Sequence, residues 1–146
     1  MKLSRFISIN SIILIGLGIA FGLYSPLMMA FFSIPEVAGM NSVSYWNVVA
    51  FARMYGAALF GFGLLLWAIR SIVESIPNSS RRGILYSLLF ANVLSIFVVV
   101  TQNFSIWQNP GGWILTSIYA IQLMGYSYFL WIYQGESSLS ETKPQE

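Results

Sequence analysis

The chain contains no cysteine, no histidine and no aspartate, and these absences exclude several kinds of functional site. Without cysteine there are no disulfides, no thiol redox chemistry and no iron–sulfur ligation. Without histidine there is no histidine-bound haem or zinc, and no histidine acid–base catalysis. We therefore expect no metal, no bound cofactor and no catalytic residues.

Charge is scarce as well. Charged residues make up 8% of the chain, against about 25% in a typical soluble domain, while hydrophobic residues reach 57%. The net charge of +2 is small and scattered, so nucleic acid is not an expected partner. This composition is typical of an integral membrane protein.

Long apolar runs account for most of the sequence, and a membrane-spanning helix needs about 20 mostly apolar residues. The runs predict an all-α fold, an integral membrane bundle of four transmembrane helices that forms one domain over residues 1–135. The first run is too long for the apolar core of a cleavable signal peptide. A short polar tail over residues 136–146 is expected to be disordered. The predicted spans cover residues 7–32, 47–69, 84–101 and 113–133.

Small residues within the first two spans suggest where helices pack closely. Gly18 and Gly22 form a GxxxG pair, which allows another helix to approach. Pro26 is expected to kink or end the first helix. The second span carries small residues that we expect at its helix contacts, namely Gly56, Ala57, Gly61 and Gly63.

Lysine and arginine are distributed unevenly between the predicted loops. They occur near both ends of the chain and in the turn over residues 70–83, whereas the linkers 33–45 and 102–112 contain none. By the positive-inside rule, both termini and the 70–83 turn are cytoplasmic. We therefore expect a multi-pass protein of the inner membrane.

Arg53 is the only charge within any predicted span, and it lies near the membrane face opposite the termini. Asn47, Gln102 and Asn103 are at the same depth, and Glu36 lies in the adjoining linker. Together they predict a polar cap that binds an anionic or hydrogen-bonding headgroup, or a quinone-like carbonyl. In the alternative interpretation, Arg53 only reaches to the interface and ties down a linker.

Asn92 and Gln122 fall near mid-depth, where an unpaired amide is unfavourable. Tyr119, Gln122 and Tyr126 share one face of the fourth span by their spacing. We expect these groups to hydrogen-bond across the bundle, either to one another or to a ligand. The candidate ligand-binding residues are therefore Arg53, Glu36, Asn47, Asn92, Gln102, Asn103, Gln122 and Tyr126.

Enzyme motifs are missing. The sequence has no glycine-rich phosphate loop, no nucleophile elbow and no pair of intramembrane carboxylates, because every glutamate lies in a linker or in the tail. We therefore do not expect an enzyme, and one acting through Arg53, Glu36 and tyrosines would lack acid–base residues.

The segment RMYGAALFGFGLLLWAIR over residues 53–70 follows a glutamate-bearing linker and precedes an arginine-rich turn. In this layout the chain resembles a group of small bacterial four-span membrane proteins of unknown function, which are loosely similar to the DoxX-like proteins. The resemblance implies an inner-membrane four-helix bundle and supplies no catalytic residue.

The function expected from these features is that of a non-enzymatic membrane module. It would bind a lipid or another hydrophobic small molecule, or act as an accessory subunit of a membrane complex. The alternative is a small oligomeric transporter or channel subunit. Membrane lipids are the expected partners, with other membrane subunits or further copies of the chain as alternatives.

Overall fold

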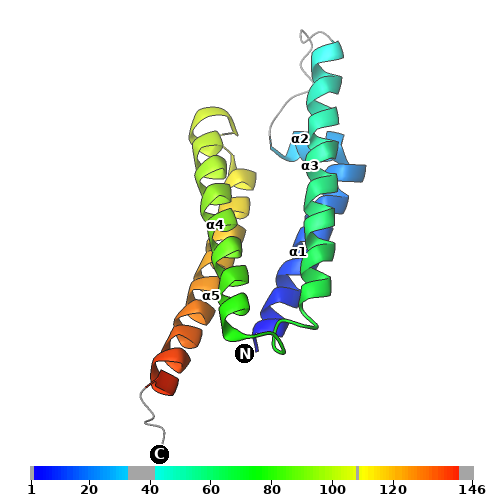
Figure 1. Cartoon of the computed structure of the whole chain (residues 1–146). Coiled ribbons are helices and arrows are strands. Elements are labelled where there is room, and N and C mark those ends of the chain that lie inside the picture. Colours follow the sequence, from blue (N-terminus) through cyan, green and yellow to red (C-terminus); the bar gives the residue numbers. More distant parts are fainter. Residues whose placement is uncertain (1, 33–41, 108, 142–146) are drawn as a thin grey trace, which may run out of the picture.

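Two helical hairpins lie side by side in the computed structural model, which describes residues 2–32, 42–107 and 109–141 (Figure 1). The first hairpin pairs α1 with α3, and the second pairs α4 with α5. No strand occurs in these ranges, so the fold is an all-α helical bundle. The elements in chain order are α1 (Leu3–Leu23), α2 (Ser25–Phe31), α3 (Ser42–Ile69), α4 (Asn78–Gln102), the π-helical turn η1 (Asn103–Trp107) and α5 (Pro110–Glu141).

Local chemistry sets the helix boundaries. The chain leaves the α-helical conformation at Tyr24, and α2 follows with Pro26 in its first turn, where a missing N–H does no harm. The prediction that Pro26 kinks or ends the first helix is confirmed. At the start of α5, the Asn109 side-chain oxygen accepts a hydrogen bond from the Gly112 N–H at 3.1 Å, and Pro110 takes the first helical position.

Helix α5 extends well past the predicted fourth span, to Glu141. The prediction of a disordered tail is therefore wrong for residues 136–141, while residues 142–146 lie outside the described ranges. Extending an existing helix avoids the unfavourable nucleation step, and no proline occurs between residues 111 and 143.

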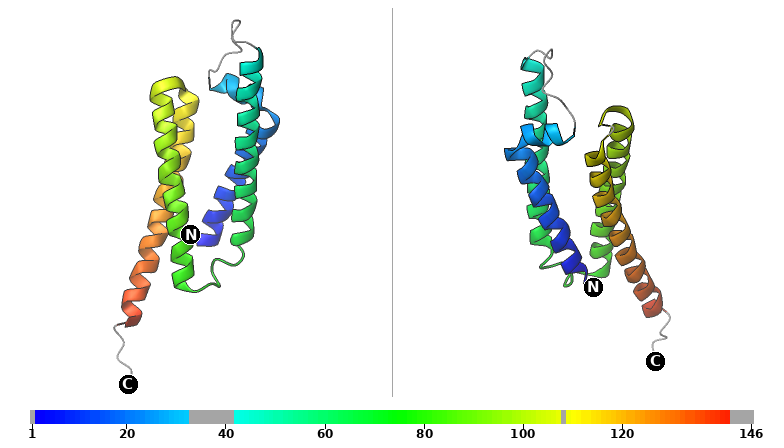
Figure 2. Two further views of the ribbon diagram at one scale, coloured as in Figure 1. Left: turned by 45° about the horizontal axis from the view of Figure 1, so that its top comes forward. Right: turned by 180° about the vertical axis from the view of Figure 1, so that it is seen from behind.

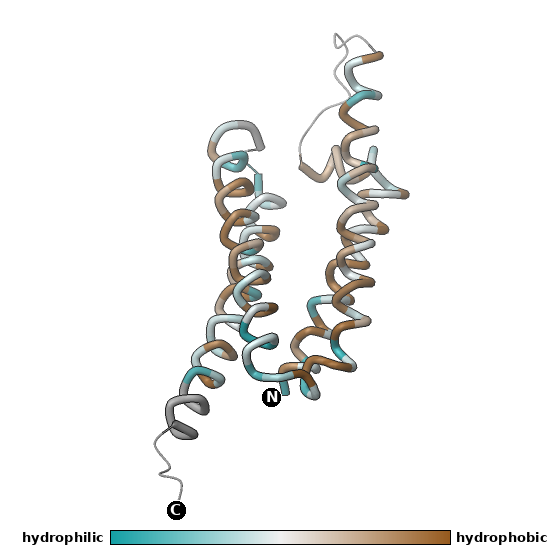
Figure 3. Tube along the Cα trace, viewed as in Figure 1, coloured by the Kyte–Doolittle hydropathy of each residue, from teal (hydrophilic) through white to brown (hydrophobic). Residues whose placement is uncertain are grey.

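Three of the described helices are long and apolar enough to cross a membrane, namely Leu3–Leu23, Val43–Ile69 and Asn78–Ser105. This property indicates a membrane protein, and hydrophobic positions follow these helices along most of their length (Figure 3). Helix α5 is not among the three, so the predicted set of four apolar spans is supported only in part. The reason is its content of Gln122 and several tyrosines, which lowers its hydropathy.

Glycines let α1 and α3 approach closely in the first hairpin. A Cβ atom at Gly18 would lie 2.6 Å from the backbone nitrogen of Phe60, and one at Gly56 would overlap the backbone of Gly22. The predicted close helix approach is thus confirmed at Gly18, whereas a Cβ at Gly22 would meet nothing within 4 Å, and only its backbone lies against Gly56. The expectation for Gly61 is wrong, because a Cβ there would meet nothing within 4 Å. Gly61 lies on the face of α3 turned away from α1, as its exposure shows.

The two hairpins meet at the end of the bundle that holds the N-terminus and residues 70–77, here called the turn end. There the Phe6 ring of α1 packs against Tyr126 and Phe129 of α5, with centroid distances of 5.1 and 5.6 Å. The Asn10 amide donates a hydrogen bond to the Tyr126 hydroxyl at 2.9 Å. Toward the opposite end, here called the open end, the hairpins diverge, as two further views show (Figure 2).

The segment between the hairpins is held by Arg81. Its guanidinium donates hydrogen bonds to the carbonyl oxygens of Val73 at 2.9 Å, Glu74 at 2.8 Å and Ile76 at 3.1 Å. It also lies 4.7 Å from the centre of the Tyr133 ring. One side chain thereby satisfies several turn carbonyls and contacts the second hairpin.

Candidate functional site: a cleft between the two hairpins

A cavity of about 400 Å³ lies between the diverging hairpins, toward the open end. Each of the helices α1 to α5 contributes at least one lining residue. The cavity exists because α3 packs on α1 and α4 packs on α5, while α3 and α4 do not pack closely on each other. A second cavity of about 240 Å³ adjoins it and shares Tyr55, Val98 and Val99. The larger cavity is lined by Phe21, Met29, Val48, Phe51, Ala52, Tyr55, Val98, Val99, Gln102 and Leu115. We call the two cavities together the cleft.

Helical spacing explains how the cleft is lined. On α3, Val48, Ala52 and Tyr55 recur every three to four residues and therefore share a face. On α5, Leu115 and Tyr119 are four residues apart and face the same way.

A pair of tyrosines bridges the cleft. The hydroxyl oxygens of Tyr55 on α3 and Tyr119 on α5 lie 3.1 Å apart, so one hydroxyl donates a hydrogen bond to the other. Two hydroxyl groups carry two protons, and this bond uses one of them. The pair therefore keeps one O–H donor and free lone pairs for another group.

Two buried amides lie one helical turn from the cleft, on the side toward the turn end. Gln122 is 3% exposed and follows Tyr119 on the same face of α5, while Asn92 is 6% exposed and precedes Ser95 on α4. The Gln122 side-chain nitrogen and the Asn92 side-chain oxygen have no hydrogen-bond partner among the described residues. Buried polar atoms of this kind are rare in folded proteins and call for a partner. The two amides thus keep unused hydrogen-bonding capacity inside the bundle.

The cleft opens sideways between α3 and α4. Phe51 and Tyr55 on α3 and Leu94 and Val98 on α4 line it and are all exposed, with Phe51 reaching 70%. At the turn end, the contacts of Phe6 and Asn10 with α5 close the space between the hairpins. Access is therefore through the apolar side of the bundle.

Several predicted site residues lie in or near this cleft. Gln102 lines it, whereas Asn92 and Gln122 are buried one helical turn from its lining residues. Tyr126 lies further toward the turn end, where its hydroxyl accepts the hydrogen bond from Asn10. Asn103 is buried at the first position of η1, where both polar atoms of its side chain have no partner among the described residues.

The structure does not gather the other predicted residues here. Arg53 is exposed and lines a separate groove of about 520 Å³ between α1 and α3, together with Gly18, Gly22 and Gly56. Among the described residues, no hydrogen bond or ion pair joins Arg53 to Gln102, Asn103 or any other group. Arg53 follows Ala52 by about 100° of helical rotation, which turns it away from the cleft. Asn47 is exposed near the start of α3, and Glu36 lies outside the described ranges.

Sequence reasoning did not select Tyr55 or Asn10 as site residues, and it placed Tyr119 on the polar face of the fourth span without including it in the candidate site. Asn10 carried a signal that could have found it, because it is the only amide in α1. The sequence alone does not show which face of each helix packs against which other helix.

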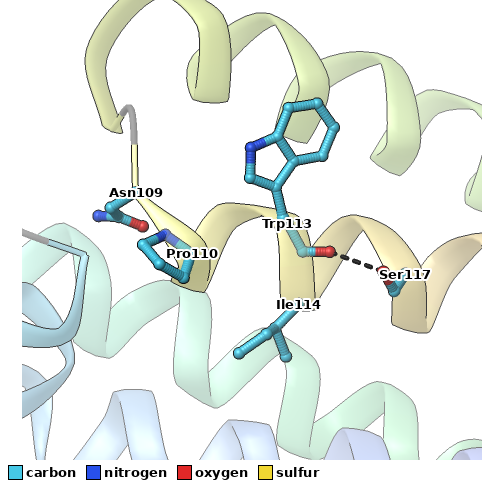
Figure 4. Close-up of a pocket in the computed structure, with 5 residues that line it drawn as sticks. All are labelled: Asn109, Pro110, Trp113, Ile114 and Ser117. Carbon is cyan, nitrogen blue, oxygen red and sulfur yellow. Dashed lines mark hydrogen bonds between the residues drawn. The ribbon is translucent and has the colours of Figure 1, made fainter.

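A further pocket, of about 560 Å³, lies on the outside of α5 near its start (Figure 4). The Trp113 ring meets Phe104 of η1 edge to face, and Ile114 points the opposite way. This pocket is a shallow surface feature around the Asn109 helix cap, so we do not assign it a function.

Glu74, at the turn end, has a perturbed pKa. The Glu74 carboxylate accepts hydrogen bonds from the Ser4 hydroxyl at 2.7 Å and from the Ser4 backbone N–H at 3.3 Å. The hydroxyl bond is the main cause that lowers the pKa of Glu74 below its ordinary value of 4.5. No cluster of three or more potential metal ligands occurs in the described part of the chain.

No protein-family model, curated protein or solved structure matches the chain. The site is therefore interpreted from its own geometry.

Proposed function

We propose that the protein is a non-enzymatic, four-span protein of the inner membrane that binds a lipid or another hydrophobic small molecule in the cleft. The single observation that carries this function is a cavity of about 400 Å³ with apolar walls and an apolar side opening. Ligand pockets commonly measure about 300–1,000 Å³ and combine apolar walls with a few polar groups. The tyrosine pair and Gln102 are such polar groups.

In this proposal α5 is the fourth span, with both termini and residues 70–77 in the cytoplasm. Helix α5 is less apolar than the others because its polar face, with Tyr119, Gln122 and Tyr126, is buried within the bundle. A polar group that faces the bundle interior is tolerated in a membrane. The arginines and lysine at the turn end support the orientation.

Native mass spectrometry of the protein purified from membranes tests the proposal. We expect a bound small molecule in the wild type and its loss in Ala52→Phe, because the phenyl ring would occupy the cavity. Ala50→Phe is the matched control, since Ala50 is exposed on the same helix and does not line the cleft. Binding that survives Ala52→Phe unchanged would place the ligand elsewhere and contradict the proposal.

The same measurement separates this function from the alternative. Discrete oligomers without a bound molecule would favour a small transporter or channel subunit. A stable complex with other chains would favour an accessory subunit.

A further inference from the structure

We infer that the molecule held in the cleft is an uncharged lipid, whose hydroxyl or carbonyl group hydrogen-bonds to the Tyr55–Tyr119 pair. This inference rests on the proposed function and specifies its ligand. It follows from three properties of the cleft, namely the absence of charge, the supply of hydrogen-bond donors and the direction of its opening.

The first property is the absence of charge. None of the residues that line the two cavities is lysine, arginine, aspartate or glutamate. Arg53 is the nearest charge on α3 in sequence, but it lines the groove against α1 instead. A phosphate or carboxylate in the cleft would lose its hydration and gain no counter-charge, which is strongly unfavourable. The cleft therefore discriminates against anionic headgroups.

The second property is the supply of hydrogen bonds. The tyrosine pair lies at the wall of the cleft and has one free O–H. Gln102 adds an amide at the side of the cleft. These groups match an ester carbonyl or a hydroxyl, which accept hydrogen bonds without carrying charge. A pure hydrocarbon would leave them unsatisfied.

The third property is the side opening between α3 and α4, where Phe51 and Val98 are 70% and 52% exposed. In the proposed membrane orientation this opening faces acyl chains and not water. A lipid could thus insert its head from the bilayer while its chains remain in apolar surroundings. Diacylglycerol is a suitable probe, because it has one hydroxyl group, two ester carbonyls and no charge.

The experiment is a competition measured by native mass spectrometry. Purified protein in detergent is exposed to equal amounts of dioleoylglycerol and dioleoyl phosphatidate, which share both acyl chains and differ in the charged phosphate. We expect retention of dioleoylglycerol at least about 10-fold above phosphatidate. The double variant Tyr55→Phe/Tyr119→Phe should reduce that retention about 2- to 10-fold, the equivalent of one hydrogen bond, whereas either single variant still keeps one free O–H. Tyr128→Phe is the matched control, because Tyr128 is exposed on α5 and does not line the cleft.

A further pair of variants changes only exposed positions, where a substitution is less able to disturb folding. Val98→Trp narrows the mouth at an exposed position, and Val93→Trp makes the same change at an exposed position outside the cleft. Only Val98→Trp should reduce retention of dioleoylglycerol.

The outcomes separate a failure of the proposed function from a failure of the inferred ligand class. If neither lipid is retained and Ala52→Phe changes nothing, the proposed function itself is wrong. If phosphatidate is retained as well as dioleoylglycerol and Ala52→Phe removes both, the cleft binds lipid but the inference of an uncharged ligand is overturned. Phosphatidate binding that depends on Arg53 and not on Ala52 would assign the ligand to the groove on α1 and α3, which also overturns the inference.

Discussion

Buried amides and tyrosine hydroxyls supply most of the polarity inside this apolar bundle. Asn10 and Tyr126 form the hydrogen bond that joins the first hairpin to the second near the turn end. Both side chains are almost fully buried, so water does not compete for the bond. An individual residue pair therefore contributes to the mutual position of whole helices.

We predict that Tyr126→Phe lowers the free energy of unfolding by about 0.5–2 kcal/mol, because the Asn10 amide loses its acceptor in a buried position. Equilibrium unfolding in detergent measures the effect. Tyr128→Phe, at an exposed position on the same helix, should change stability by less than about 0.5 kcal/mol. Equal effects of the two substitutions would contradict the importance of the bond.

The glycines of α3 are not equivalent, and their substitution by alanine should have opposite effects. Gly56→Ala should destabilise the protein by about 1–3 kcal/mol, because the new methyl group overlaps the backbone of Gly22. Gly61→Ala should be neutral or stabilising by up to about 1 kcal/mol, since its Cβ meets no atom within 4 Å and alanine favours the helix. Thermal unfolding of both variants in one detergent gives the comparison. A loss of stability in Gly61→Ala would mean that a further helix packs on this face.

At the scale of elements, the connection over residues 70–77 depends on one arginine. We predict that Arg81→Lys weakens it, because lysine cannot donate simultaneously to the carbonyls of Val73, Glu74 and Ile76. Limited proteolysis should cleave this connection faster in the variant, with a lower midpoint of thermal unfolding. Arg82→Lys is the control, because Arg82 makes none of these bonds. Unchanged cleavage in Arg81→Lys would show that the turn holds its conformation without the guanidinium.

The contact between Ser4 of α1 and Glu74 in the connection over residues 70–77 should depend on pH. Glu74 accepts hydrogen bonds from Ser4 as a carboxylate, and these lower its pKa in the folded state. Its contribution to stability is therefore fully present above the unfolded pKa of about 4.5, and is lost as the pH falls through the lower folded value. The thermal midpoint of the wild type should drop between about pH 5 and pH 3 by more than that of Glu74→Gln. If the thermal midpoints of the wild type and of Glu74→Gln fell in parallel with pH, the hydrogen bonds of Glu74 would not explain the pH dependence.

The positions of the helices along the chain were easier to predict than the helix faces that pack against one another. Apolar runs located α1, α3 and α4, and Pro26 located the break after α1, because these features depend on local sequence. Helix α5 is not among the helices apolar enough to cross a membrane, although Gln122, Tyr119 and Tyr126 face the interior. The site was predicted only in part. Asn92 and Gln122 were recognised as unusual at their depth, and Gln102 was predicted as part of a polar cap around Arg53. The direction of Arg53, however, depends on how α3 is rotated against α1.

For the molecule as a whole, the number of membrane crossings is the property that decides the proposed topology. The chain has no native cysteine, so single cysteines can be introduced at Ser44, Ser79 and Ser140 without background labelling. With four spans, only the Ser44→Cys variant reacts with an impermeant maleimide added outside intact cells. Ser79→Cys and Ser140→Cys should react only after permeabilisation. External labelling of Ser140→Cys, with Ser79→Cys protected, would show that α5 does not cross the membrane.

The division into two hairpins also has a consequence for biosynthesis. Each hairpin packs mainly within itself, and the contacts between them are confined to a few side chains such as Phe6, Asn10 and Tyr55. On a ribosome, α1 and α3 can therefore pair before α4 has been synthesised, and the second hairpin then docks onto a finished partner. Two separately translated halves, divided within residues 70–77, should for this reason reassemble in the same membrane. The cleft would then form last, at the moment when the two halves join.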